Sequence, residues 1–354
     1  MSGFDQPEID GVARRFQAHE RNQKACRLGS PCNFTSEAAT LNQTPKGPPR
    51  QRIDGVLFID KPVGLTSNGV LGVVKRLYNA DKAGHTGTLD PFATGLLPVA
   101  LGAATKFSGH LLDADKTYLA TMRLGVTTTT ADLEGEVLQT RPVDVSDAQI
   151  EVALARFRGP IAQIPPMFSA LKRDGKPLYE YARAGQTLER EARRVTIHEL
   201  QQVARAGIEV AFRVTCSKGT YVRTLAEDIG EALGCGAHLI ALRRERTGGF
   251  GLEGALTLGQ LEAMTMEGRI AALRPVDTLL SALPAVHLDA ALAARLKLGQ
   301  RLPLDAIAGP NSPTIPASDT QIAPAILARA YSQECAFLGL VRLENGVLHP
   351  ERLA

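Results

Sequence analysis

The sequence lacks the features of secreted, membrane-spanning and disulfide-stabilised proteins. It contains no apolar run of about 18 residues or more, which a membrane helix needs, and its polar start has no signal-peptide hydrophobic segment. Its five cysteines, Cys26, Cys32, Cys216, Cys235 and Cys335, are scattered and form no C-x-x-C pair. Neither a disulfide framework nor a zinc ribbon is therefore predicted. We expect a soluble cytoplasmic protein with buried free thiols.

Several signatures of common enzyme classes are also missing. There is no dinucleotide-binding glycine fingerprint and no G-x-S-x-G nucleophile elbow, and the glycine-rich stretch at 84–95 lacks the GK[ST] ending of a P-loop. The net charge of +3 is slight. Total charge therefore does not identify a nucleic-acid-binding protein, and only local clusters of basic residues can do so.

The length of 354 residues, of which 44% are hydrophobic, suits one large domain plus a smaller one. Residues 1–52 mix Gln, Asn, Ser, Pro and both charge signs without a sustained period, so we expect a disordered extension there. Its basic residues could contact RNA, but a solvated tail is the simpler interpretation.

Short apolar segments alternate with helical patterns from residue 56 onward. Capping signals predict helices that begin at Ser67, at Ser146 with Gln149, at Thr257 with Gln260 and at Asp289, and apolar spacing predicts another over 219–234. Strands are expected at 56–60, 117–124, 136–140, 195–200, 208–216 and 238–242. Several of these strands are joined by too little chain for a parallel crossover, which favours an α+β fold with a mixed or antiparallel sheet. After a boundary at 275–284 we expect a long proline-rich loop over 302–333 and a hairpin over 335–348.

The most distinctive stretch is GHTGTLDPFATG, residues 84–95, with Asp90 near its middle. Its three glycines and Pro91 predict a tight loop, neither helix nor strand, whose backbone can approach a ligand closely. Because a residue before proline favours extended geometry, we expect the Asp90 side chain to be set by its backbone. A fixed carboxylate among glycines is a candidate site. The alternative is an Asx turn in which Asp90 only binds neighbouring N–H groups.

The segment 159–194 has a different composition from the rest of the chain. Prolines punctuate it, and Phe168, Tyr179 and Tyr181 alternate with seven basic residues, namely Lys172, Arg173, Lys176, Arg183, Arg190, Arg193 and Arg194. Cations bind phosphate and aromatic rings stack on bases, so this composition predicts a nucleic-acid surface. An ordinary solvated helix with mixed charges would look similar.

These stretches resemble a known family. GHTGTLDPFATGLLPVALGAATKF, residues 84–107, is similar to the catalytic-aspartate motif of the TruB-type tRNA pseudouridine synthases. The blocks DADKTYLATMRLG, FRGPIAQIPPMFSALK, GKPLYEYAR and CSKGTYVRTLAEDIGEALGCGAHLIALRR resemble the same family in order and spacing. The resemblance is strong over 53–244, weak to residue 354 and absent over 1–52.

The resemblance implies a domain organisation. It predicts a pseudouridine synthase fold over 53–275, with an RNA-gripping insertion at about 159–194. A small, degenerate PUA-like β domain is expected over 276–354, with the proline-rich stretch at about 302–333 as an insertion that departs from the family pattern.

The resemblance also implies an activity, the conversion of uridine to pseudouridine at position 55 in the T-loop of tRNA, without metal or other cofactor. It assigns the catalytic carboxylate to Asp90, its cationic partner to Arg223 and the base-stacking ring to Tyr118. Asp90 would act either as a nucleophile or by deprotonating the sugar, and the sequence leaves both routes open. Without the motif, Arg223 would be a first-turn surface arginine and Tyr118 a core residue.

Further substrate contacts are implied at His85, Tyr221, Leu242 and Lys61. His85 would bind the RNA loop, although a turn residue or a metal ligand is an alternative, and no second ligand at metal spacing supports the metal. Tyr221 and Leu242 would line the uracil pocket, while sequence alone makes Leu242 plain core. Lys61 matches a motif with a structural or RNA-facing role.

Lys172, Arg173 and Lys176 are the candidate phosphate contacts of the insertion. One departure from the family is Thr129, where relatives commonly carry an acid, which leaves a local turn contact open.

Two other functions remain: an RNA-binding or RNA-folding protein without catalysis, and a guide-RNA-dependent relative. The joint presence of Asp90, Tyr118 and Arg223 favours catalysis, and the basic insertion favours a monomer that holds the tRNA T-arm itself, without a protein partner or a membrane.

Overall fold

The computed structural model describes residues 49–303 and 325–354. Most of the predicted extension at 1–52 and most of the predicted proline-rich insertion lie outside the described residues. The chain divides into two units, Met1–Pro49 and Arg50–Ala354. The architecture below is that of the second unit. Among its described helices, none combines the length and the hydropathy required to cross a membrane.

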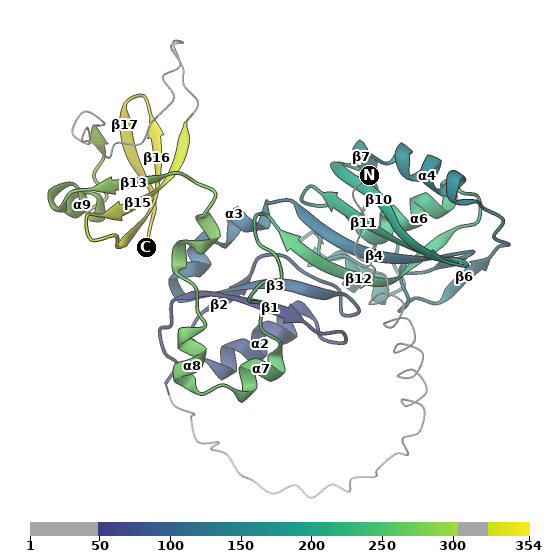
Figure 1. The fold of residues 1–354 in the computed structure, drawn as a ribbon, viewed down its shortest axis with the longest axis horizontal. Helices are drawn as coiled ribbons and strands as arrows, with labels where there is room; N and C mark the ends of the chain where they lie inside the picture. The colour runs from purple at the N-terminus through teal and green to yellow at the C-terminus, as the bar shows by residue number, and fades with distance from the viewer. Residues whose placement is uncertain (1–48, 304–324) are drawn as a thin grey trace, which may run out of the picture. The chain divides into compact units, whose positions relative to one another are not determined.

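A mixed eight-stranded sheet forms the centre of the large domain (Figure 1). Its order is β1-β3-β12-β4-β11-β10-β7, with β2 paired to β3. The parallel pair is β3 with β12, and the other neighbours run antiparallel. The strands are β1 (Gly55–Lys61), β2 (Ala83–His85), β3 (Thr94–Leu101), β4 (Lys116–Leu124), β7 (Gly159–Gln163), β10 (Arg193–Ala206), β11 (Glu209–Cys216) and β12 (Ala237–Thr247). The predicted α+β class with a mixed sheet is confirmed.

Two hydrophobic cores hold the helices to this sheet. Helices α4 (Asp147–Arg156) and α6 (Val222–Ala232) pack with β4, β10, β11 and β12, and Met122, Phe212 and Leu225 are fully buried there. Helices α2 (Ser67–Leu77) and α7 (Leu258–Ala263) pack with β1 and β3, with α8 (Met266–Ala271) alongside. Each fully buried Leu, Val or Phe side chain contributes roughly 1.5–3 kcal/mol. The capping boxes predicted at Ser146 and at Thr257 are both present.

The boundaries of the glycine-rich loop differ from the prediction. Gly84 and His85 belong to β2, and Thr94 and Gly95 begin β3, so the irregular loop covers only residues 86–93. We call this segment the catalytic loop, after the role that the family resemblance implies for Asp90. Gly95 has a φ of 103°, and a Cβ there would lie 2.2 Å from the backbone oxygen of Arg244. Tertiary pairing therefore explains this glycine, whereas the sequence suggested a tight loop whose backbone approaches a ligand.

Two local predictions were wrong in detail. The side chain that caps α2 is Thr66, which accepts a hydrogen bond from the Gly69 N–H at 2.9 Å, whereas Ser67 lies inside the helix. Strand β12 does not stop at Leu242 but continues through Arg244 to Thr247, because its ladder to β4 continues. Tertiary pairing thus overrides the low strand propensity of the basic run.

In its described residues, the small domain is a five-stranded sheet with one helix, α9 (Ala290–Lys297), capped by Asp289 as predicted. Its order is β13-β15-β16-β17-β14, formed by β13 (Ala285–Leu288), β14 (Leu302–Pro303), β15 (Ile326–Ser332), β16 (Phe337–Glu344) and β17 (Val347–Leu353). The predicted C-terminal hairpin is confirmed as β16–β17, with Asn345 and Gly346 at positive φ as in a two-residue hairpin turn. Strand β15 corrects the loop predicted over 302–333, because alternating burial at Ala328 and Ala330 places it in the sheet.

Candidate active site

The two residues predicted to form the catalytic ion pair lie together. Asp90 is in the catalytic loop and Arg223 is on the first turn of α6. Arg223 Nε is 2.9 Å from Asp90 Oδ2, and Nη2 donates to Oδ1 at 3.4 Å. This two-point contact uses the planar geometry of guanidinium, which lysine lacks. The Arg223 side chain is 5% exposed and that of Asp90 is 33% exposed, so the carboxylate presents one face to solvent.

Arg223 is fixed by contacts with two further segments of the chain. Its Nη2 donates to the carbonyl of Phe168 at 2.8 Å, and its Nη1 donates to the carbonyl of Thr130 at 3.1 Å. Nη1 also lies 3.4 Å from Oδ2 of Asp132. The guanidinium therefore has little freedom to leave Asp90. The Phe168 contact comes from the basic insertion, which thereby reaches the catalytic pair.

Sequence reasoning missed Asp132. This carboxylate is buried and also accepts hydrogen bonds from Thr130 Oγ1 at 2.5 Å and from the Glu134 N–H at 3.0 Å. The sequence feature that could have indicated Asp132 is its position three residues after Thr129, inside the turn-rich stretch TTTTADLEG. Thr129 itself makes the turn contact that was left open, because its Oγ1 accepts from the Glu136 N–H at 3.1 Å.

The electrostatics of Asp90 follow from these neighbours. Burial raises the pKa of the Asp90 carboxyl above its ordinary value, the nearby Asp132 acts in the same direction, and Arg223 and Lys61 oppose both. Arg223 thus offsets part of the desolvation, which would otherwise favour the protonated carboxyl still more strongly. An ionised, partly desolvated carboxylate is suited to attack an electrophilic carbon or to remove a proton.

Lys61, predicted to contact substrate or to serve a structural role, lies beneath the catalytic loop. Its side chain is fully buried, and its ammonium donates to the carbonyls of Pro62 at 2.9 Å, Pro91 at 3.2 Å and Ala93 at 2.6 Å. Burial lowers the pKa of Lys61 to about 8. This position supports the structural alternative, since all of these acceptors are backbone groups.

A second buried cation holds the other end of the loop. Arg244 is almost completely buried, and it donates to the carbonyls of Leu96 at 2.8 Å and Gly87 at 3.1 Å. Its strand position pairs with Tyr118 in β4. The sequence offered only a basic run after residue 242, with nothing to indicate that one member of the run points inward.

The remaining predicted residues lie on β2, β4 and β12 and at the N-terminus of α6. Burial raises the pKa values of the Tyr118 and Tyr221 phenols, and the Asp90 charge acts in the same direction on both. Leu242 is buried in the core beside them, opposite Ala120. His85 is half-buried in β2, and its Nδ1 accepts from the Gly87 N–H at 3.4 Å. Burial and the nearby Arg244 lower the pKa of His85, which favours the neutral ring.

Comparison with known families gives this arrangement a context. The N-terminal domain of the TruB family pseudouridylate synthases matches residues 75–222. The tRNA pseudouridylate synthase B C-terminal domain matches 223–281, and the C-terminal domain of pseudouridine synthase II TruB matches 284–354. The chain belongs to the TruB family. The enzyme class expected from the motifs, an isomerase that makes pseudouridine, is thereby confirmed.

Individual relatives agree with the TruB assignment. The tRNA pseudouridine synthase B of Burkholderia mallei is 60% identical over 304 residues, which cover 86% of this chain and 98% of the relative. That of Cupriavidus metallidurans is 56% identical over 307 residues, covering 86% and 95%. Among solved structures, a Cbf5–Nop10–Gar1 complex matches with a TM-score of 0.64 and 29% identity over 84% of both chains. An H/ACA ribonucleoprotein bound to a substrate RNA containing 2′-deoxyuridine matches with a TM-score of 0.62 and 27% identity, again over 84% of both chains.

The insertion of this TruB protein carries its candidate RNA contacts on a hairpin. Lys172 and Arg173 form β8 and Lys176 begins β9, joined by a turn at Asp174 and Gly175 with φ angles of 52° and 79°. All three basic side chains are exposed. Beside the hairpin, the Lys176 Nζ lies 4.8 Å from the ring centroid of Tyr181 and the guanidinium of Arg183 lies 5.3 Å from that of Tyr179. The predicted interleaving of cations and aromatic rings is present.

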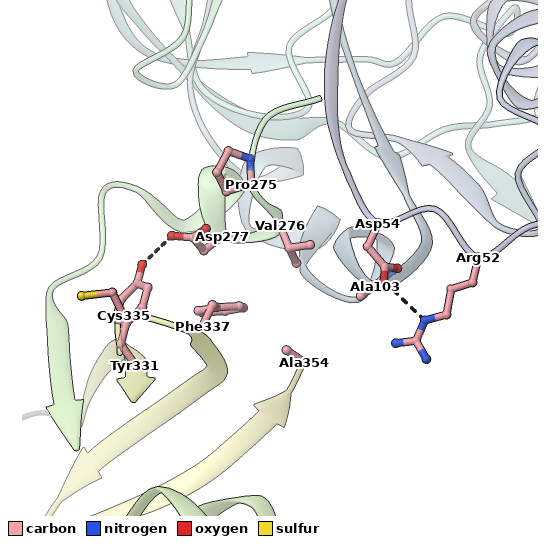
Figure 2. A pocket seen from close by; sticks show the side chains of 10 residues that line it. All are labelled: Arg52, Asp54, Ala103, Pro275, Val276, Asp277, Tyr331, Cys335, Phe337 and Ala354. Carbon is pink, nitrogen blue, oxygen red and sulfur yellow. Dashed lines mark hydrogen bonds and ion pairs between the residues drawn. The ribbon is translucent and has the colours of Figure 1, made fainter. Parts of the chain in front are cut away.

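A separate cavity of about 490 Å³ lies away from these residues (Figure 2). Its lining polar groups are already paired in part: Tyr331 donates to Asp277 at 2.5 Å, and Asp54 accepts from Arg52 at 3.3 Å. None of the predicted catalytic residues lines it. Its wall is formed by Arg52, Asp54, Ala103, Pro275, Val276, Asp277, Tyr331, Cys335, Phe337 and Ala354.

Proposed function

We propose that this protein converts one uridine in the T-loop of tRNA, at position 55, to pseudouridine. The observation that carries the proposal is the two-point ion pair between Asp90 and Arg223, in a loop whose carboxylate keeps one face open. The family membership and the tRNA pseudouridine synthases at 56–60% identity support the same substrate class.

The reaction is an isomerisation, so its bonds and protons balance within the substrate. The C1′–N1 glycosidic bond breaks, the uracil turns, and a C1′–C5 bond forms. The proton lost from C5 is matched by the proton gained at N1. Asp90 assists the first step by one of two routes. Either it attacks C1′ and is displaced when the C1′–C5 bond forms, or it takes a proton from C2′ and returns that proton to C2′ when the C1′–C5 bond forms.

The neighbouring residues prepare the base for this step. The uridine must leave its stack at a cost of a few kcal/mol. Stacking on the Tyr118 ring contributes roughly 1–3 kcal/mol, and Tyr221 and Leu242 supply the pocket wall. Arg223 keeps Asp90 ionised while the base excludes water. His85, the last residue of β2 before the catalytic loop, is proposed to contact the displaced RNA loop.

The substrate is held by the protein itself. The exposed cations of the β8–β9 hairpin are proposed to bind phosphates of the T-arm. The Nop10 and Gar1 components and the H/ACA ribonucleoprotein named for the two structural neighbours belong to those assemblies. The basic hairpin favours a monomeric enzyme that acts on tRNA without a guide RNA, in the cytoplasm where tRNA is processed.

The proposal is tested by mapping pseudouridine. Purified protein is incubated with an unmodified tRNA transcript and with a matched transcript in which the T-loop uridine is replaced by cytidine. We expect one pseudouridine in the first transcript and none in the second. In cells that lack the protein, pseudouridine should disappear from this position alone. Full modification of that position in those cells would contradict the proposal.

A further inference from the structure

One segment of the chain makes hydrogen bonds to the catalytic loop on both sides of Asp90. It covers residues 61–67, KPVGLTS. The Lys61 ammonium binds the carbonyls of Pro91 and Ala93, and the Gly64 N–H donates to the carbonyl of Pro91 at 2.8 Å. The loop is therefore held on the C-terminal side of Asp90 by the beginning of this segment.

The N-terminal side of Asp90 is held by Ser67. Its Oγ accepts a hydrogen bond from the Leu89 N–H at 2.8 Å and donates to the Leu89 carbonyl at 3.1 Å. Ser67 is 1% exposed and the Leu89 side chain is also buried. One hydroxyl thus pairs both backbone polar groups of the residue that directly precedes Asp90.

This hydroxyl is not needed to begin the helix. Thr66 caps α2, and buried Val70 and Val74 fix the helix to the core. The Ser67 hydroxyl therefore has a role separate from helix formation. Without it, the N–H and C=O of Leu89 would lose their partner in a buried place, where an unpaired polar group is costly. The peptide that leads into Asp90 would then turn toward other partners or water.

We propose that Ser67 is a positioning residue for catalysis, because it fixes the peptide before Asp90 and so aims the carboxylate at both Arg223 and the substrate sugar. This inference rests on the proposed function. Ser67 is 1% exposed, and among the described residues its hydroxyl hydrogen-bonds to Leu89, so its effect on Asp90 would be transmitted through Leu89. Misplacement of a reacting group by about 1 Å reduces rates by about a hundredfold, so the loss should fall on the chemical step.

The test compares Ser67→Ala with Thr66→Ala as a matched control on the same helix. The single-turnover rate of pseudouridine formation at saturating protein, the affinity for tRNA and the melting temperature are measured for each. Ser67→Ala is expected to slow the rate by about ten- to a hundredfold, with tRNA affinity within about threefold of wild type. Thr66→Ala should lower the melting temperature while its rate stays within about twofold.

A second variant covers the case in which Ser67→Ala does not accumulate as folded protein. Ser67→Cys nearly keeps the volume, but its sulfur is a weak donor and a weak acceptor, so the same loss of rate is expected. Provided that the wild-type protein forms pseudouridine, either of two results overturns the inference about Ser67. One is a Ser67 variant whose rate stays within about twofold of wild type. The other is a loss of rate in Thr66→Ala as large as that in Ser67→Ala. A wild-type protein that forms no pseudouridine in tRNA would instead overturn the proposed function.

Discussion

Arg223 binds Asp90 at two points, with Nε 2.9 Å from Oδ2 and Nη2 3.4 Å from Oδ1, although the two residues are 133 positions apart in the chain. Asp132 approaches the same guanidinium from its other side at 3.4 Å. The cation therefore stands between two carboxylates, of which only Asp90 has an open face. This arrangement supports the proposal that Asp90 carries out the chemistry and that Asp132 holds Arg223 in place.

Replacing Asp90 by asparagine should separate binding from chemistry. The substitution keeps the shape of the side chain and removes its charge. We expect pseudouridine formation to vanish while tRNA affinity stays within about tenfold, or about 1.4 kcal/mol. Asp54→Asn, on the distant cavity of Figure 2, is the control and should keep full activity. Normal tRNA modification by purified Asp90→Asn would contradict the assignment.

Substitutions of Arg223 should distinguish charge from geometry. Arg223→Lys keeps a cation but loses the planar fork, so turnover should fall with little change in tRNA affinity. Arg223→Met also leaves buried Asp132 without its cation, and urea denaturation should show a loss of about 3–5 kcal/mol in the free energy of unfolding.

The double variant Arg223→Met with Asp132→Asn tests the cause of that loss. It removes the unpaired buried charge, so its free energy of unfolding should exceed that of Arg223→Met alone by about 1 kcal/mol or more. Arg123→Met, which breaks an exposed pair with Glu209, should change little. Equal stability of the single and double variants would show that Asp132 does not depend on Arg223.

The hairpin cations should determine how tRNA binding responds to salt. Replacing Lys172, Arg173 and Lys176 with alanine should weaken binding and reduce the slope of log affinity against log salt by about one unit for each lost phosphate contact. Binding is measured at several salt concentrations. The control triple variant replaces three arginines that already pair with carboxylates, Arg123, Arg158 and Arg205. An identical slope in wild type and hairpin variant would make the hairpin an ordinary solvated surface.

Asp228 on α6 should make the protein less stable as pH rises. Burial raises the pKa of its carboxyl from 3.8 to about 6. The folded state therefore holds this proton more tightly than the unfolded state, so stability is lost as pH rises from about 4 to about 6. Asp228→Asn removes the ionisation. Relative to wild type it should gain about 1 kcal/mol between pH 4 and pH 8, after allowance for solvent screening.

Urea denaturation at pH 4 and pH 8 measures this difference. Glu231→Gln, an exposed residue on the same helix that pairs with Arg141, is the control. The expected result is a relative gain for Asp228→Asn that is absent from the control. A relative loss with rising pH would show that the Asp228 carboxylate has a cation partner in solution.

The sequence by itself determined the features that depend on neighbours along the chain. The glycines and Pro91 around Asp90 predicted an irregular loop, and capping boxes at Ser146 and Thr257 predicted helix starts. Alternating apolar residues predicted most of the strands. These signals are local because backbone conformation and helix capping depend on residues a few positions apart. Family motifs added the roles of Asp90 and Arg223, which no local pattern carries.

Tertiary structure alone decided which polar side chains hold the site in place. From its residue type and position Ser67 was predicted to cap a helix, yet its hydroxyl binds Leu89, 22 positions away. Arg244 belongs to a basic run typical of a protein surface. It is nevertheless buried, and it donates to the carbonyls of Leu96 and Gly87, which are 148 and 157 positions away. Asp132 stood in a turn and pairs with Arg223. Burial makes a polar group dependent on whichever partner the fold brings near it, and chain spacing does not encode that partner.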